Sequence, residues 1–186
     1  VMILKDRMLE TLKEWIQADQ EREPFTIHAL ETKALLPLGE HTITIRIDRI
    51  DYVNQQPVLI DYKTGRANIV DTFLPSFEHP QMALYSLTQN IPPAIAYAKL
   101  LPKTALWQPV DLGCDKTLKK HLNSRGHEPM SLQSLKELWT QKAHSSLLQY
   151  TQGKFQADPA SIKTCDQCDF MSLCRIYDQG EDNPHD

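Results

Sequence analysis

The stretch PVLIDYKTG, residues 57–65, decides how the rest of the chain is interpreted. After its opening proline come three adjacent apolar residues, which suit a central strand that is covered on both faces of a sheet. Asp61 and Lys63 follow at a spacing of two, so their side chains leave the same face of that strand. Gly65 ends the strand. The stretch therefore predicts a buried strand that brings an acid and a base to one face of a sheet.

A β-hairpin is predicted directly before this strand. Apolar and polar residues alternate over residues 25–38 and again over residues 41–53, and Gly39 stands between the two segments as a turn residue. In the second segment the apolar residues keep odd positions until the alternation breaks at Asp48. We expect a bulge or a bend there, because such irregularities re-aim single side chains and are common beside active sites. Asp48 would then approach Asp61 if the two strands are neighbours.

Helices and further strands flank this part of the chain. In chain order we expect a helix over residues 2–23 that ends near Pro24, a helix from Pro80 to about Gln89, strands at 94–101 and 105–110, and a long helix capped by Ser131. The first helix is expected to pack one apolar stripe on the core, formed by Leu4, Met8, Leu12, Trp15 and Ile16. The last has an apolar face of Leu132, Leu135, Leu138, Trp139 and Leu147. This order predicts an α/β fold with a mixed sheet between helices.

Composition and charge limit the classes of function. With 186 residues and 41% hydrophobic content, we expect one domain: a helix at 1–23, a core at 24–152 and a cysteine-containing tail at 153–186, all from a longer parent chain. No long apolar run or signal peptide is present, which favours a cytoplasmic protein without membrane contact. The net charge of −4 argues against a free-standing, high-affinity nucleic-acid binder. It does not exclude a nuclease, because bound divalent cations add positive charge and a helicase-type partner can deliver the strand.

Asp48, Asp61 and Lys63 form the set that phosphodiester hydrolysis requires. Carboxylates bind Mg²⁺ or Mn²⁺, which polarise the phosphate and lower the pKa of a bound water. A lysine beside them can orient that water and stabilise developing charge. The alternative is structural: Asp48, Arg49 and Asp51 would form surface ion pairs, and the acid and base after residue 60 would merely end a strand. A short acidic and basic motif alone does not decide between these interpretations.

The order of three motifs favours the catalytic interpretation. The run IDRID at residues 47–51 is followed by VLIDYKTG at 58–65 and by QMALY at 81–85, in which Gln81 and Tyr85 share one helix face. This succession resembles the motifs of RecB-family nucleases within the PD-(D/E)xK superfamily. It is also similar to AddB-type nucleases and to the C-terminal region of the bacterial "probable DNA repair protein" group, whose chains carry a helicase-like region ahead of the nuclease.

The resemblance implies a fold and a role for each motif residue. It implies a restriction-endonuclease-like α/β/α core, a function as a metal-dependent deoxyribonuclease in DNA repair or recombination, and exonuclease action. Asp48 and Asp61 would bind the metal, Lys63 would be the catalytic lysine, and Gln81 with Tyr85 would face the DNA. Glu31 resembles an extra glutamate that some members place near the metal. A solvated strand residue is the alternative for Glu31.

The last cysteines extend the resemblance. Cys165, Cys168 and Cys174 are spaced like the C-terminal cysteines that hold an iron–sulfur cluster in AddB-type nucleases, so we expect three ligands of a 4Fe–4S cluster. We expect the fourth ligand before Val1, since Cys114, the remaining candidate, has no counterpart in the family. Zinc is an alternative, because four-thiolate sites also bind it.

Two rival functions stay open. Many family members have a metal-binding histidine on an upstream helix, and no histidine of this chain stands in that context, so it either precedes Val1 or is lacking. An inactive nuclease fold with a structural or strand-binding role is therefore the first rival. The second rival, a zinc-binding interaction domain, accounts for the cysteines and for none of the strand motifs.

Overall fold

The computed structural model describes most of the chain, in two compact units. The described residues are 2–65, 67–73, 77, 79–89, 93–101, 104–123, 128, 130–154, 157, 159, 162–166 and 168–174. The units are Val1–His144 and Ser145–Asp186. The first holds the sheet and the three strand and helix motifs, and the second holds Cys165, Cys168 and Cys174.

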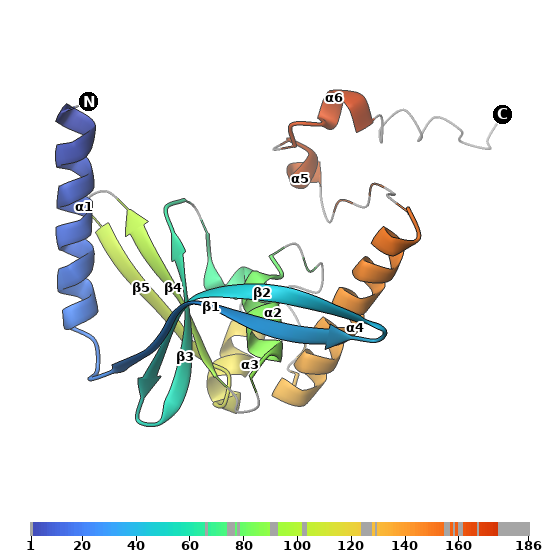
Figure 1. Cartoon of the computed structure of the whole chain (residues 1–186), viewed down its shortest axis with the longest axis horizontal. Coiled ribbons are helices and arrows are strands. Elements are labelled where there is room, and N and C mark those ends of the chain that lie inside the picture. The colour runs from blue at the N-terminus through green and yellow to red at the C-terminus, as the bar shows by residue number, and fades with distance from the viewer. Residues whose placement is uncertain are drawn as a thin grey trace. The chain divides into compact units, whose positions relative to one another are not determined.

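A five-stranded mixed sheet forms the centre of the first unit (Figure 1). Its strands lie in chain order: β1 (Thr26–Leu38), β2 (His41–Val53), β3 (Gln56–Lys63), β4 (Ala94–Leu101) and β5 (Thr104–Asp111). All neighbours are antiparallel except β3 and β4, which are parallel. A parallel pair needs a crossover, and here it contains the 3₁₀ helix η1 (Ile69–Phe73) and helix α2 (Gln81–Leu87). The predicted α/β fold with a mixed sheet is confirmed.

Helix α1 (Met2–Gln20) packs against β4 and β5 on one face of the sheet. The core on this face joins Trp15 to alternate residues of β3 and β4, among them Val58, Ile60 and Ala96. The predicted apolar stripe is wrong in its orientation, because Trp15 alone of its five members is buried. The other four, Leu4, Met8, Leu12 and Ile16, are between 44% and 65% exposed. The side of α1 that faces the sheet instead carries polar residues, because Asp19 on that side forms an ion pair with Arg49 of β2.

The β1–β2 hairpin reaches beyond β3 as a two-stranded ribbon (Figure 1). Strand β2 pairs with β3 from Arg49 onward, whereas its earlier residues pair in the described part of the chain with β1 alone. The ribbon turns at Gly39, whose φ of +63° favours glycine. The expected bulge at Asp48 is wrong in position. The register shift lies in β1, between Ile27 and Ala29.

The structure describes five further helices: two in the first unit, two in the second and one whose residues belong to both. Helix α2 contacts β2 and β3, and helix α3 (Asp115–Asn123), in a segment without clear periodicity, contacts β5 and η1. Helix α4 (Leu132–Thr151) begins after Ser131, whose Oγ accepts a hydrogen bond from the backbone N–H of Ser134, as the predicted cap requires. The second unit contains α5 (Ile162–Asp166) and α6 (Met171–Cys174). None of the described helices has the length and apolar character of a membrane span.

Candidate functional site

The strands β2 and β3 separate at Asp48, and this fork brings two carboxylates together. Their ladder starts at the pair Arg49 and Ile60, so the next position in register sets Asp48 opposite Asp61. At that point Asp48 Oδ2 accepts a hydrogen bond from the backbone N–H of Tyr62, at 3.1 Å. The side chain thus satisfies a backbone donor that the departing strand leaves unpaired. Asp48 and Asp61 therefore stand on the same face of the sheet.

Asp61 is a buried carboxylate with an oxygen that lacks a hydrogen bond. Its side chain is 2% exposed, and Lys63 Nζ lies 2.7 Å from Asp61 Oδ2. Among the described residues that oxygen has no hydrogen-bond partner of good geometry, so we treat the lysine contact as an ion pair. Burial raises the pKa of Asp61, the ammonium of Lys63 counteracts this, and the nearby charge of Asp48 raises the pKa further. A cation beside Asp61 and Asp48 would relieve both the desolvation and the like-charge repulsion.

A chain of hydrogen bonds connects Lys63 to helix α2 and back to β2. Lys63 Nζ donates to Gln81 Oε1 at 2.6 Å, and Gln81 Nε2 donates to the Tyr85 hydroxyl oxygen at 3.0 Å. The Tyr85 hydroxyl donates to the backbone carbonyl of Arg46 at 2.7 Å. Burial raises the pKa of Tyr85 to about 12, so the hydroxyl keeps its proton and remains a donor. Gln81 and Tyr85 thus fix the ammonium of Lys63, and a contact of this pair with DNA stays a prediction.

Glu31 lies at the level of Asp48 but is engaged elsewhere. It falls between the register pairs Leu30–Arg49 and Thr32–Ile47, with a φ of +48°. Its Oε2 forms an ion pair with Arg46 Nε at 2.6 Å, and both side chains are more than half exposed. Its charge also contributes to the raised pKa of Tyr85, which locates it near the cluster. The role predicted for Glu31 remains untested.

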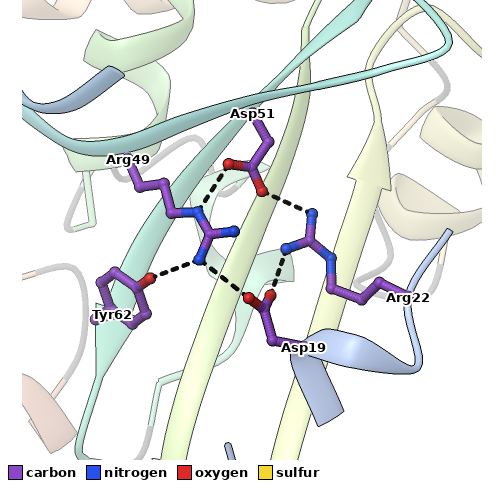
Figure 2. Close-up of polar contacts among 5 residues, drawn as sticks. All are labelled: Asp19, Arg22, Arg49, Asp51 and Tyr62. Carbon is purple, nitrogen blue, oxygen red and sulfur yellow. Dashed lines mark hydrogen bonds and ion pairs between the residues drawn. The ribbon is translucent and has the colours of Figure 1, made fainter. Parts of the chain in front are cut away.

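The other two charged residues of the IDRID run face the opposite side of the sheet (Figure 2). Arg49 Nε donates to Asp51 Oδ1 at 2.7 Å, and Arg49 Nη1 donates to Asp19 Oδ2 and to the Tyr62 hydroxyl, both at 3.1 Å. Arg22, just beyond α1, pairs with Asp19 at 2.5 Å and with Asp51 at 3.0 Å. We call the four charged residues, Asp19, Arg22, Arg49 and Asp51, the α1 ion lattice. The structural alternative is therefore correct for Arg49 and Asp51, except that their ion pairs are buried.

Aromatic rings enclose the α1 ion lattice. The Arg22 guanidinium lies 3.8 Å from the centre of the Trp107 ring and 4.3 Å from that of Phe25. Although burial disfavours the charge of Arg49, its hydrogen bonds to Asp51 and Tyr62 raise its pKa. The alternation in β2 is thus unbroken, because Arg49 and Asp51 continue the buried face as charged residues. This is the physical reason why the expected bulge at Asp48 is absent.

A pocket that the sequence did not predict opens beside Lys63. Its volume is about 330 Å³, and it is lined by Lys63, Ala67, Asn68, Asp71, His79, Pro80, Gln81 and Tyr97. These residues come from the loop after β3, from η1, from the start of α2 and from β4. Asn68 and Asp71 follow no periodic pattern, and the one available signal was His79, which lies two residues before the helix motif.

The donor set fits a divalent cation that is completed by substrate. No group of three or more His, Cys, Asp or Glu side chains suited to a metal is gathered within the described residues. Asp48 and Asp61 supply two carboxylates, and the buried Asp61 Oδ2 has the ion pair with Lys63 but no hydrogen bond of good geometry among the described residues. Mg²⁺ is commonly bound by one or two carboxylates together with substrate phosphates and water. The residues present are therefore consistent with such an ion.

The cysteines lie in both units and are free thiols. Cys165 is buried, Cys168 is exposed, and Cys174 is intermediate. The backbone N–H of Cys168 donates to the carbonyl of Cys165 at 3.0 Å, which makes a tight turn between the first two. Cys114 belongs to the first unit, where it follows β5. A cluster on Cys165, Cys168 and Cys174 stays a prediction.

Known proteins resemble this chain to different extents. The crystal structure of SSO0001 is similar at 17% identity and a TM-score of 0.43, over 94% of this chain and 70% of that one. The crystal structure of protein VC1899 from Vibrio cholerae is similar at 16% identity and a TM-score of 0.29, over 79% of this chain and 33% of that one. No curated protein matches the chain significantly. Residues 1–175 match the model of the PD-(D/E)XK nuclease superfamily. Since this match covers nearly the whole chain, the chain belongs to the PD-(D/E)XK nuclease superfamily.

Proposed function

We propose that this chain is a metal-dependent nuclease that hydrolyses phosphodiester bonds in DNA. The observation that carries the proposal is the fork between β2 and β3, where Asp48 and Asp61 share one face and Lys63 Nζ lies 2.7 Å from Asp61. Membership of the superfamily supports it independently. In this proposal Asp48 and Asp61 hold Mg²⁺ or Mn²⁺.

The roles of the side chains follow from their contacts. When bound, the divalent ion would polarise the phosphate and supply a water of lowered pKa. Lys63, held between Asp61 and Gln81, orients the attacking water and stabilises charge that develops on the phosphate. Tyr85 is a positioning residue, because its hydroxyl is bonded to the backbone of Arg46 and to Gln81. Gln81 is the member of the pair that we expect to reach DNA, and Glu31 is a further carboxylate that the site can recruit from its exposed pair with Arg46.

Narrower assignments rest on the sequence alone. They are a RecB- or AddB-type nuclease module in DNA repair or recombination, exonuclease action, a helicase-type partner or a helicase-like region of a parent chain, and a cytoplasmic location. An iron–sulfur cluster on Cys165, Cys168 and Cys174 belongs to the same set. Anaerobic reconstitution, followed by absorption spectroscopy of the chain and its Cys114→Ser variant, tests the cluster. A cluster that depends on Cys114 would contradict a fourth ligand outside this chain.

One observation favours the rival, an inactive nuclease fold that binds a strand. Asp48 and Asp61 are two carboxylates, and the described residues gather no third metal-binding side chain beside them. The two functions differ in one measurable respect. The rival predicts DNA binding without strand cleavage under any divalent ion.

The test is incubation of the chain with end-labelled single- and double-stranded DNA in Mg²⁺, Mn²⁺ or EDTA. We expect cleavage with either ion and none in EDTA. Lys63→Ala and Asp61→Ala should each lower the rate by at least about 100-fold, the loss typical of removing one group that stabilises the transition state. Lys33→Ala and Asp6→Asn, which change exposed residues of the same types, are the matched controls.

Circular dichroism should show that all four variants keep the fold. Cleavage that survives both site substitutions would mean that the assigned site is wrong. Binding by the unmodified chain without any cleavage would favour the inactive module.

A further inference from the structure

The pocket beside Lys63 has the size and walls of a site for a single planar group. Its volume of about 330 Å³ falls at the lower end of the range for small-ligand pockets, roughly 300–1,000 Å³. The ring of Tyr97, the imidazole of His79 and the ring of Pro80 provide flat surfaces. Asn68 and Gln81 provide amide groups for hydrogen bonds at the edges of a ligand.

The pocket walls are fixed by the protein itself. The buried Lys99 donates from Nζ to the carbonyl of Ala67 at 2.5 Å, which ties the loop after β3 to β4. Asn68 Oδ1 accepts from the backbone N–H of Val70 at 3.2 Å, so that side chain is held by one oxygen while its amide nitrogen makes no hydrogen bond to the described residues. Tyr97 is buried in β4, opposite Asp61 in register. Little ordering would be required of the pocket when a ligand enters.

The charges in the pocket disfavour a phosphate as its occupant. Lys63 is the cation at one end, and it already contacts Asp61 and donates to Gln81. Asp71 places a carboxylate in the same lining. A phosphate would therefore meet a like charge, whereas a neutral aromatic ring would not. A nucleobase combines a flat apolar face with polar edges and matches both features of the walls.

We propose that this pocket receives one unstacked nucleobase, next to the phosphate at Lys63, and that the chain therefore engages DNA as a single strand. The proposal rests on the proposed nuclease site, because Lys63 belongs to both the carboxylate cluster and the pocket lining. A base inside an intact duplex is stacked on both faces and cannot enter such a pocket without being extruded. His79 and Asn68 are specificity residues of this site, and His79 is exposed at its rim.

The test compares two strands that differ by one base. The first is a short DNA strand of about ten abasic nucleotides, and the second is the same strand with one central adenine. Both strands carry the same phosphates, so they differ only in the base. The second strand can shift along the protein until its one base enters the pocket. Binding is measured by fluorescence anisotropy in EDTA and in Ca²⁺, with the integrity of the strands checked on a gel.

We expect the single base to tighten binding by about 5- to 100-fold, the range typical of stacking one base on protein side chains. His79→Ala and Asn68→Ser should abolish this gain. His41→Ala, which removes an exposed histidine from the hairpin turn, should leave it unchanged. Asn68→Ser keeps an oxygen for Val70, so a loss there reports on the amide donor rather than on the loop.

Equal affinity for the two strands, including no measurable binding of either, overturns the proposal, as does a gain that both pocket variants keep. Tighter binding of a blunt duplex than of a single strand with the same sequence also overturns it. The outcome is separable from that of the cleavage assay. If the single base tightens binding but the chain never cleaves DNA, the nucleobase pocket is supported and the nuclease function is not. If the chain cleaves DNA but the base does not tighten binding, the nuclease function is supported and the pocket is not.

Discussion

At the scale of single residues, the raised pKa of Asp61 has a consequence for stability. A carboxyl whose pKa is higher in the folded chain than in the unfolded chain makes its ionisation a cost to folding. That cost is fully present above the folded pKa and disappears as the pH falls through it toward the unfolded value. Asp61→Asn should therefore raise the melting temperature of the metal-free chain near pH 7, and the difference should shrink toward pH 4.

Thermal unfolding in EDTA across this pH range measures the effect. Asp6→Asn, at an exposed position of α1, should show no such pH-dependent difference. Addition of Mn²⁺ should stabilise the unmodified chain and not Asp61→Asn. A variant that is less stable than the unmodified chain at pH 7 in EDTA would contradict the raised pKa.

The sequence predicted some of these residues because their geometry is local. Two strand residues at a spacing of two always share a face, so Asp61 and Lys63 could be placed together without any tertiary information. The break in alternation drew attention to Asp48, although no bulge lies there. It reflects Arg49 and Asp51 replacing apolar residues on the buried face, which depends on partners from α1 that a strand pattern cannot contain.

At the scale of elements, the α1 ion lattice fixes the helix to the sheet. Asp51 is fully buried and accepts from both Arg22 and Arg49, so Asp51→Asn leaves two guanidinium groups to share the single carboxylate of Asp19. Removing one partner of a buried ion pair typically costs about 3–5 kcal/mol. We expect a loss of unfolding free energy of that order in urea, together with faster proteolysis within α1.

Glu21→Gln is the matched control, since Glu21 lies just beyond the same helix, is exposed, and accepts a hydrogen bond from Gln17. Stabilisation by divalent ion should persist in Asp51→Asn, because Asp51 lies on the face opposite to Asp61. An unchanged urea midpoint would show that the lattice contributes no net stability. Loss of the metal effect alone would instead connect Asp51 to the site.

Helical periodicity predicted that α1 exists but not which side it buries. The apolar stripe from Leu4 to Ile16 satisfies every pattern rule, yet Trp15 and Asp19 face the sheet, because the sheet presents an apolar core to Trp15 and the charged Arg49 to Asp19. Helix α3 escaped prediction because its segment has few apolar residues to show a period.

At the scale of the whole molecule, the net charge of −4 opposes DNA binding by the metal-free chain. We expect weak affinity for DNA in EDTA and a marked increase on adding Ca²⁺ or Mg²⁺, since bound cations neutralise Asp48 and Asp61 where the strand must approach. Anisotropy titrations with single-stranded DNA measure this. In the double variant Asp48→Asn with Asp61→Asn, affinity should be high in EDTA and insensitive to the ion. An ion effect of equal size in that variant would place the cations elsewhere.

The β1–β2 hairpin couples local unfolding of its outer strand to the binding of a divalent ion at Asp48 and Asp61. Because the outer part of β2 is paired on one side only in the described structure, its amides should exchange with deuterium faster than those of β3 and β4. Asp48 stands at the base of this ribbon, so an ion that needs both carboxylates should slow exchange throughout residues 41–48. Asp48→Asn should remove the slowing. The ribbon would then act as a reporter, in which the exchange rate of a surface hairpin measures occupancy of a site inside the sheet.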